Sequence, residues 1–375
     1  MKNPFVTNGY VSPEYFCDRE KETAKIVSLL MNENNIALIS PRRLGKTDLL
    51  RHCFGQSEIK EHYHTFIIDI YATSSVRDFV NVFGKAVLDE LRPKGKSVWS
   101  AFLNVLASLR SEITFDMNGQ PTWGIGLGAI TNPSATLDEI FSYLNNAGKP
   151  CLIAIDEFQQ ITKYTDDPNI EAALRTHIQR CSNAHFVFSG SHRHLMGAMF
   201  TSPARPFYQS VTLINLPPIS VDKYAEFCHK NFELAGKRLD TLVVAELYNR
   251  FNGITSYMQK VMNILFSMTG AGEICIPSMI DIAINDLLDF SADTYDALLY
   301  QMPEKQRIAF MAIAAEGKAK AISSGDFVRK YRLQSASSVS SAVKGLLEKD
   351  FITYDKGIYQ VYDQFFQLWL QRNKL

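Results

Sequence analysis

The chain has 375 residues, of which 46% are hydrophobic and 21% charged, and its 39 Lys and Arg residues balance 39 Asp and Glu residues. This length suffices for two or three domains, and the neutral balance excludes a global electrostatic attraction to nucleic acid or membrane surfaces. No apolar run approaches the roughly 20 residues that a membrane-spanning helix needs.

The cysteines predict a reducing compartment. They are scattered, none forms a C-x-x-C pair, and several fall in apolar segments where a thiol acts as a small hydrophobe. The first residues lack the pattern of a signal peptide. We therefore expect a cytoplasmic protein without disulfides. The cysteines are Cys17, Cys53, Cys151, Cys181, Cys228 and Cys275.

The most informative segment lies near the N-terminus, after a predicted helix that ends at Asn32. A strand predicted at Ile36–Ile39 runs into a tight loop that ends in Gly45-Lys46-Thr47, and an amphipathic helix follows to Phe54. Strand, loop and helix in this order predict a P-loop, in which backbone N–H groups and the helix N-terminus face phosphates. Lys46 is predicted to reach the outer phosphates of ATP and Thr47 to bind Mg²⁺. The predicted nucleotide-binding residues here are Ser40, Pro41, Arg42, Arg43, Leu44, Gly45, Lys46, Thr47 and Asp48.

Two features of the loop leave its details open. Ser40 stands where the P-loop pattern has Gly, a residue favoured there because it accepts unusual dihedral angles. Arg42 and Arg43 have three interpretations: they contact a phosphate, face an acidic partner surface, or are solvated.

Strands and helices alternate through the next hundred residues. A hairpin is predicted around Asn118-Gly119, and the spaced glycines that follow up to Gly128 favour a strand edge over a dinucleotide-binding loop. The other predicted elements are a strand at 64–71 and helices at 76–91, 98–109 and 136–147.

A second motif supports the P-loop. The apolar run Cys151–Ile155 is typical of a buried parallel strand, and it ends in Asp156 and Glu157. Ligands of open α/β sheets bind at the carboxyl ends of strands. Asp156 is therefore predicted to hold Mg²⁺ beside Thr47, and Glu157 to orient or deprotonate the attacking water. Asp156 and Glu157 could instead simply begin a solvated loop or cap a helix, and neither motif alone decides between the two interpretations. Both motifs in this order predict a nucleotide site.

Two further residues are candidates for the catalytic site. Ser191 follows a strand predicted from His185, where with Ser189 it could contact the γ-phosphate or only cap a helix, and neither alternative is favoured. Arg205 precedes the last predicted core strand, Val211–Leu216. Its flanking prolines would hold the loop rigid, which favours a phosphate contact in this or a neighbouring subunit over a surface ion pair.

This order predicts an α/β core at residues 1–218 with a doubly wound, mostly parallel sheet. Residues 219–298 have helical patterns only, predicted at 221–235, 241–250, 256–268 and 280–288. Residues 299–375 show helix–turn–helix patterning followed by a hairpin that turns at 355–357, which predicts a winged helix. From Gln301 onward, 12 Lys and Arg face 7 Asp and Glu, so this module is modestly basic.

Several of these segments together resemble the archaeal-type ATPase family, a group of P-loop ATPases related to the AAA+ and signal-transduction ATPases. They are Phe16-Cys-Asp-Arg-Glu20, Pro41–Thr47, Ile155–Gln159, Ser189-Gly-Ser191 and Tyr362–Trp369. The resemblance implies a P-loop core, a helical lid, a C-terminal winged helix, and use of ATP with Mg²⁺. It also implies that Arg19 lies near the adenine. Asp18 and Ser40 stand where the family pattern has Gly.

The sequence supports three hypotheses. The first is an ATP-binding switch with slow Mg²⁺-dependent ATPase activity, an unidentified protein partner and an open oligomeric state. The alternative is a DNA-binding regulator or initiator that uses ATP to gate DNA contact through the winged helix. The third is an interaction scaffold whose nucleotide is structural.

Overall fold

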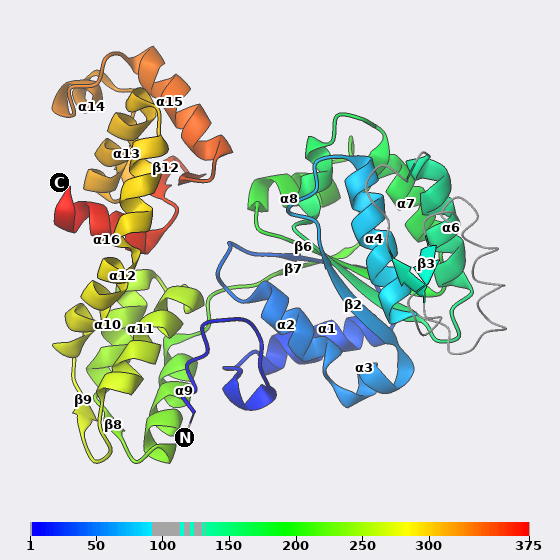
Figure 1. Cartoon of the computed structure of the whole chain (residues 1–375), viewed down its shortest axis with the longest axis horizontal. Helices are drawn as coiled ribbons and strands as arrows, with labels where there is room; N and C mark the ends of the chain where they lie inside the picture. The colour runs from blue at the N-terminus through cyan, green and yellow to red at the C-terminus, as the bar shows by residue number, and fades with distance from the viewer. Residues whose placement is uncertain (1, 92–112, 116–120, 124–129, 131, 375) are drawn as a thin grey trace. The chain divides into compact units, whose positions relative to one another are not determined.

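The computed structural model describes residues 2–91, 113–115, 121–123, 130 and 132–374 (Figure 1). The chain divides into two compact units. Asn8–Lys223 form one unit, and Tyr224–Leu375 form the other together with the first residues of the chain. The predicted division of the second unit into a helical lid and a winged helix stays a prediction.

The first unit is built on a five-stranded sheet. Its strands are β1 (Ile36–Ile39), β2 (His64–Asp69), β5 (Cys151–Asp156), β6 (Ala184–Gly190) and β7 (Thr212–Asn215). The spatial order is β2-β5-β6-β1-β7, and every neighbouring pair is parallel. The predicted parallel sheet is therefore confirmed. The strand that leads into the acidic pair lies beside the strand that ends in Ser189 and Gly190.

Helices cover both faces of this sheet (Figure 1). Within β1, Ile36 and Leu38 pack into one core, whereas Ala37 and Ile39 pack into the other, because side chains alternate along a strand. The first core contains α1 (Glu20–Met31), α2 (Lys46–Phe54) and α3 (Ser57–His62). The second contains α4 (Val76–Glu90), α6 (Pro133–Asn145), α7 (Ile170–Arg180) and α8 (Arg193–Thr201).

Some elements differ from the sequence prediction. Helix α3 and the 3-10 turns η1 (Pro13–Tyr15) and η3 (Phe158–Lys163) were not predicted, because such short elements carry too little periodicity. Strands β3 (Ile113–Phe115) and β4 (Pro121–Trp123) pair antiparallel, which confirms the hairpin. Its turn at 118–119, the glycines at 124–128 and the helix predicted at 98–109 lie outside the described residues.

The second unit begins with helices. They are α9 (Val221–Leu234), α10 (Thr241–Phe251), α11 (Thr255–Met268) and α12 (Met279–Gln301), with short strands β8 (Arg238–Leu239) and β9 (Ile274–Cys275) between them. The prediction ended α12 near Leu288, but the helix continues because Tyr295 and Leu299 keep an apolar stripe in register with it. Tyr295 stacks on Phe366 with ring centroids 4.6 Å apart.

The C-terminal part has the elements of the predicted winged helix. They are α13 (Glu304–Glu316), β10 (Ala319–Lys320), α14 (Gly325–Lys330), α15 (Ala336–Glu348), β11 (Ile352–Asp355), β12 (Ile358–Val361) and α16 (Gln364–Asn373). Strand β12 lies between β10 and β11. Lys356 and Gly357 join the hairpin strands with φ of 46° and 82°, the paired positive values that match the twist of a tight hairpin. Among the described helices, none has both the length and the apolar character that crossing a membrane requires.

The reactivity of the cysteine thiols tests the packing of this fold. All six lie in the described part of the chain, and each is a buried free thiol. Burial raises the pKa of Cys53 and of Cys151 to about 12. Because the thiolate is the reactive form, these two groups stay protonated and shielded at pH 8. We expect the native protein to react slowly with Ellman's reagent at pH 8 and to titrate six thiols in guanidinium chloride. Rapid modification of several thiols in the native protein would contradict the packing.

Candidate active site

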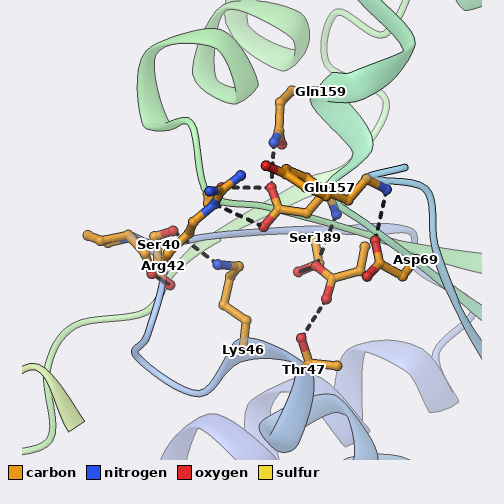
Figure 2. A network of polar contacts seen from close by, with 12 residues as sticks. Ser40, Arg42, Lys46, Thr47, Asp69, Glu157, Gln159 and Ser189 are labelled. Carbon is orange, nitrogen blue, oxygen red and sulfur yellow. Dashed lines mark hydrogen bonds and ion pairs between the residues drawn. The ribbon is translucent and has the colours of Figure 1, made fainter. Parts of the chain in front are cut away.

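The site lies where parallel strands end. In the sheet register Asp69 at the end of β2 pairs with Asp156 at the end of β5, and Ile39 at the end of β1 pairs with Gly190 at the end of β6. The loops that leave these strands therefore start at one edge of the sheet. Residues that are far apart in the sequence meet there (Figure 2).

The loop between β1 and α2 has the backbone of an anion cradle. Arg43 and Gly45 have φ of 70° and 83°, and α2 begins at Lys46. Left-handed residues of this kind turn successive backbone N–H groups to one side, at a helix N-terminus that favours negative charge. Ser40 is absent from the residues with positive φ, and its buried hydroxyl donates to the Pro41 carbonyl at 3.0 Å. Ser is thus accommodated where the loop pattern has Gly.

Lys46 is a buried cation in this loop. Its side chain points back across the loop, and Nζ donates to the Ser40 carbonyl oxygen at 3.3 Å (Figure 2). Burial lowers the pKa of Lys46, while the charges of Glu157 and Asp156 act in the opposite direction. An ammonium that has lost water needs anionic partners. Lys46 is thus suited to a polyanion.

Asp156 connects the two motifs. The Thr47 hydroxyl donates to Oδ2 of Asp156 at 2.5 Å, and the Ser189 hydroxyl donates to Oδ1 at 2.7 Å (Figure 2). Asp156 is buried. The Thr47 hydroxyl and the Asp156 carboxylate together present hard oxygen donors, the kind that Mg²⁺ prefers. The residues therefore fit the metal that the sequence predicted for them.

Glu157 is held by several donors. Its backbone is left-handed, with φ of 55°. One carboxylate oxygen, Oε2, accepts from the Ser191 hydroxyl at 2.6 Å and from the Gln159 amide at 2.5 Å. Nε of Arg42 lies 3.8 Å from the other oxygen, Oε1. Burial alone would raise the pKa of Glu157, but the bonds from Ser191 and Gln159 and the charges of Lys46 and Arg42 outweigh it, so the pKa is lowered.

The environment of Arg42 is one that the sequence interpretations did not include. Its guanidinium contacts Glu157 of the same chain, and Nε also donates to the Ser191 hydroxyl at 3.2 Å. The same group lies over the Tyr71 ring, 4.9 Å from the centroid, which is a cation–π arrangement. The Arg42 side chain is 21% exposed, so it is neither free in solvent nor fully buried.

Sequence reasoning missed two residues at this site. Asp69 ends β2 beside Asp156, and burial together with the nearby Asp156 and Glu157 carboxylates raises its pKa. A signal for it existed, since it is an acidic residue at the carboxyl end of a predicted strand. Gln159 bonds Glu157 from the 3-10 turn η3, which the sequence did not predict.

Three predicted residues are not joined to this cluster by the contacts of the described residues. Arg205 pairs with Glu171 of α7. Arg19 is 2% exposed and donates to Glu22 at 3.0 Å, while its Nη2 has no hydrogen-bond partner among the described residues. Asp48 lies in the first turn of α2, with Arg51 3.9 Å away, and burial raises its pKa.

A parallel sheet flanked by helices, with a phosphate-type loop beside an acidic strand end, defines the class of P-loop ATPases. The family described as ATPase domain predominantly from Archaea matches residues 16–261, and the chain belongs to it. Residues 293–372 match the family described as probable winged helix domain. The resemblance and the fold class predicted from the sequence are confirmed. No curated protein matches the chain.

Solved structures agree with this fold. A Walker-type ATPase of Pyrococcus abyssi is 15% identical, with a TM-score of 0.63, over 98% of this chain and 99% of that chain. The ORC1 protein of Aeropyrum pernix, solved in complex with DNA, is 12% identical with a TM-score of 0.55 over 96% and 94% of the two chains. The ORC2 protein of Aeropyrum pernix, in ADPNP–ADP complexes, is 12% identical with a TM-score of 0.55 over 99% and 98%. At these identities the likeness concerns the fold alone.

Gly190 supports the wall of the site. A Cβ atom there would lie 2.4 Å from Oε1 of Gln159 and 2.5 Å from Sδ of Met196, so both side chains would have to move. We expect Gly190→Ala to lower the free energy of unfolding by about 1–3 kcal/mol, the usual cost of overpacking. Urea denaturation followed by circular dichroism measures it.

Gly197 of α8 is the matched control, because a Cβ atom there meets nothing within 4 Å. Gly197→Ala is expected to stabilise the protein by up to about 1 kcal/mol, since Ala is the better helix former. Equal effects of the two substitutions would contradict the predicted crowding at Gly190.

Proposed function

We propose that this protein is a nucleotide-controlled switch that binds ATP and hydrolyses it slowly with Mg²⁺. The observation that carries the proposal is the contact between Thr47 at the end of the P-loop and Asp156 at the end of β5, which joins a phosphate cradle to an acidic pair. A site with only one of these features would bind anions or cations but not a metal–triphosphate.

In this proposal the loop binds the triphosphate. The N–H groups around Arg43 and Gly45, and the N-terminus of α2, would hold the inner phosphates. Lys46 would exchange its contact with the Ser40 carbonyl for an outer phosphate oxygen. The buried ammonium would then be hydrogen-bonded directly to an anion. Pro41 and Leu44 complete the loop, and Arg43 remains a candidate phosphate ligand.

Thr47 and Asp156 would hold Mg²⁺, which supplies positive charge against the developing charge of the transferred phosphoryl group when it is bound. Glu157 would accept a hydrogen bond from the attacking water and take its proton. Ser191, which already bonds Glu157, would orient that carboxylate or touch the γ-phosphate.

The proposed roles of the remaining predicted residues rest on fewer contacts. The free Nη2 of buried Arg19 is a hydrogen-bond donor available to a base, which supports the position near the adenine that the family resemblance implied. Arg205 would act as an arginine finger only after leaving Glu171. Because that pair is partly buried, Arg205 would leave it only if a neighbouring subunit or partner supplied another anion in place of Glu171.

Lys46→Ala tests the proposal. Without the ammonium, the phosphates lose their main cation in the loop, and we expect ATP affinity to fall by at least about 100-fold, as for other charge-assisted contacts. Isothermal titration calorimetry with ATP and Mg²⁺ measures the affinity, and release of inorganic phosphate measures turnover. Lys60→Ala, in α3 and away from the loop, is the control. Unchanged ATP affinity in Lys46→Ala would rule out this site.

A second candidate function is ATP-gated DNA binding through the C-terminal module. It is favoured by the match of residues 293–372 to a probable winged helix domain and by the exposed serines on one face of helix α15, Ser337, Ser340 and Ser341. The charge distribution weakens it. Lys330 pairs with Glu316, Arg329 with Asp326 and Lys344 with Glu348, so several cations of the module are already compensated.

DNA binding by this module has a defined salt dependence. With few uncompensated cations, we expect binding only below about 50 mM salt, with a shallow slope equivalent to about two or three phosphate contacts. Fluorescence anisotropy of labelled duplex DNA at several salt concentrations, with and without ATP, measures it. A phosphate would have to replace Glu348 as the partner of Lys344, and Lys344→Ala on α15 should then reduce the slope by about one. A slope unaffected by Lys344→Ala would place any DNA contact elsewhere.

A further inference from the structure

The contact between Arg42 and Glu157 is unexpected in a site of this kind. Arg42 belongs to the loop that would receive phosphates, whereas Glu157 is the residue proposed to activate water. Their side chains nevertheless face each other, 3.8 Å apart, and both bond the Ser191 hydroxyl (Figure 2).

These contacts oppose a role for Glu157 as a base. Two donors, Ser191 and Gln159, occupy Oε2, and the guanidinium of Arg42 lies beside Oε1. A carboxylate that is compensated in this way is a stable anion with little tendency to accept a proton. For Glu157 to act on water, at least one of these partners has to leave.

Arg42 is the partner that a nucleotide would displace. It lies in the loop, 21% exposed, and it stacks on Tyr71 and bonds Ser191 without full burial. Gln159, by contrast, is 3% exposed and fixed in η3. A triphosphate carries several negative charges, so it competes for a guanidinium more strongly than one carboxylate does.

We propose that Arg42 is a positioning residue that holds Glu157 until a triphosphate arrives, and that phosphate binding transfers Arg42 from Glu157 to the nucleotide. The inference rests on the proposed ATP site. It makes Glu157 and the phosphates competitors for one cation. Release of the carboxylate is thereby coupled to the presence of the substrate on which it would act.

A double-mutant cycle on ATP affinity tests this competition. Four proteins are compared by calorimetry with a non-hydrolysable ATP analogue and Mg²⁺: the wild type, Arg42→Ala, Glu157→Gln and the double variant. Glu157→Gln should tighten binding by about three- to tenfold in the wild-type background, because Arg42 then no longer faces a carboxylate at position 157. In the Arg42→Ala background, the same change should leave the affinity within about twofold.

The cycle separates this inference from simpler explanations. Glu157→Gln also removes a negative charge near the phosphates. If relief of that repulsion were the whole effect, binding would tighten to the same extent in both backgrounds. Equal tightening with and without Arg42 would therefore overturn the proposed competition. Arg43→Ala removes the same charge from the next loop position and is the matched control, in whose background Glu157→Gln should still tighten binding.

Two further outcomes are distinguishable. Absence of binding by the wild type would overturn the proposed ATP site itself. If circular dichroism shows that Arg42→Ala does not fold, Arg42→Gln replaces it, because the Gln side chain removes the charge but keeps packing against Tyr71. The expected loss of the Glu157→Gln effect is the same for this variant, and its persistence would overturn the inference.

Discussion

The whole site depends on the contact between Thr47 and Asp156. It joins two residues 109 positions apart in the sequence, and it does so because β1 and β5 both pair with β6 in one parallel sheet. The strands are buried on both faces, so a slip in register would expose apolar side chains of either core. Burial of the sheet thereby fixes the distance between the phosphate loop and the acidic pair. The chemistry of the site is set by hydrophobic packing several residues away from it.

Two residues of the site have an unfavourable backbone conformation. Arg43 and Glu157 both have left-handed backbones, with φ of 70° and 55°, although neither is glycine. Such conformations cost about 1–2 kcal/mol for an ordinary residue, and they persist where neighbouring packing fixes the chain. The turn at Glu157 separates its side chain from that of Asp156. One carboxylate faces Thr47, and the other faces Arg42 and Ser191. Two adjacent acids can thus have different roles.

Much of this arrangement could be predicted from the sequence. A P-loop pattern and an acidic strand end are local signals, and the rule that ligands bind at the carboxyl ends of parallel strands brings Lys46, Thr47, Asp156 and Glu157 together without coordinates. The contacts of Arg42 could not be predicted. They depend on the left-handed turn at Glu157 and on which way a long side chain points, neither of which has a periodic signal.

Arg205 illustrates the same limit. Its position in a proline-flanked loop indicated a rigid arginine but not which anion it meets, because Glu171 lies 34 residues earlier on another element. The extent of α12 was missed for a different reason. The apolar stripe past Leu288 is carried by only two buried residues, Tyr295 and Leu299, among five aspartates along the helix. Their packing, rather than the local composition, extends the helix.

Charge compensation allows cations and carboxylates to be buried together in this site. Lys46 and Arg42 would be costly to leave buried alone, by several kcal/mol for a fully desolvated ion. Asp156, Glu157 and Asp69 supply the opposite charge nearby. Bonds from Ser191 and Gln159 and the charges of Lys46 and Arg42 lower the pKa of Glu157 in spite of burial, whereas burial is the largest cause of the lowered pKa of Lys46 and the raised pKa of Asp69. A triphosphate would then replace carboxylates as the partner of the cations, rather than bind to cations that have no anion nearby. Its affinity would be the difference between two sets of ion pairs, and a difference of that kind can be tuned by small shifts of one side chain. That property is consistent with the proposed role as a switch and is less suited to tight storage of nucleotide.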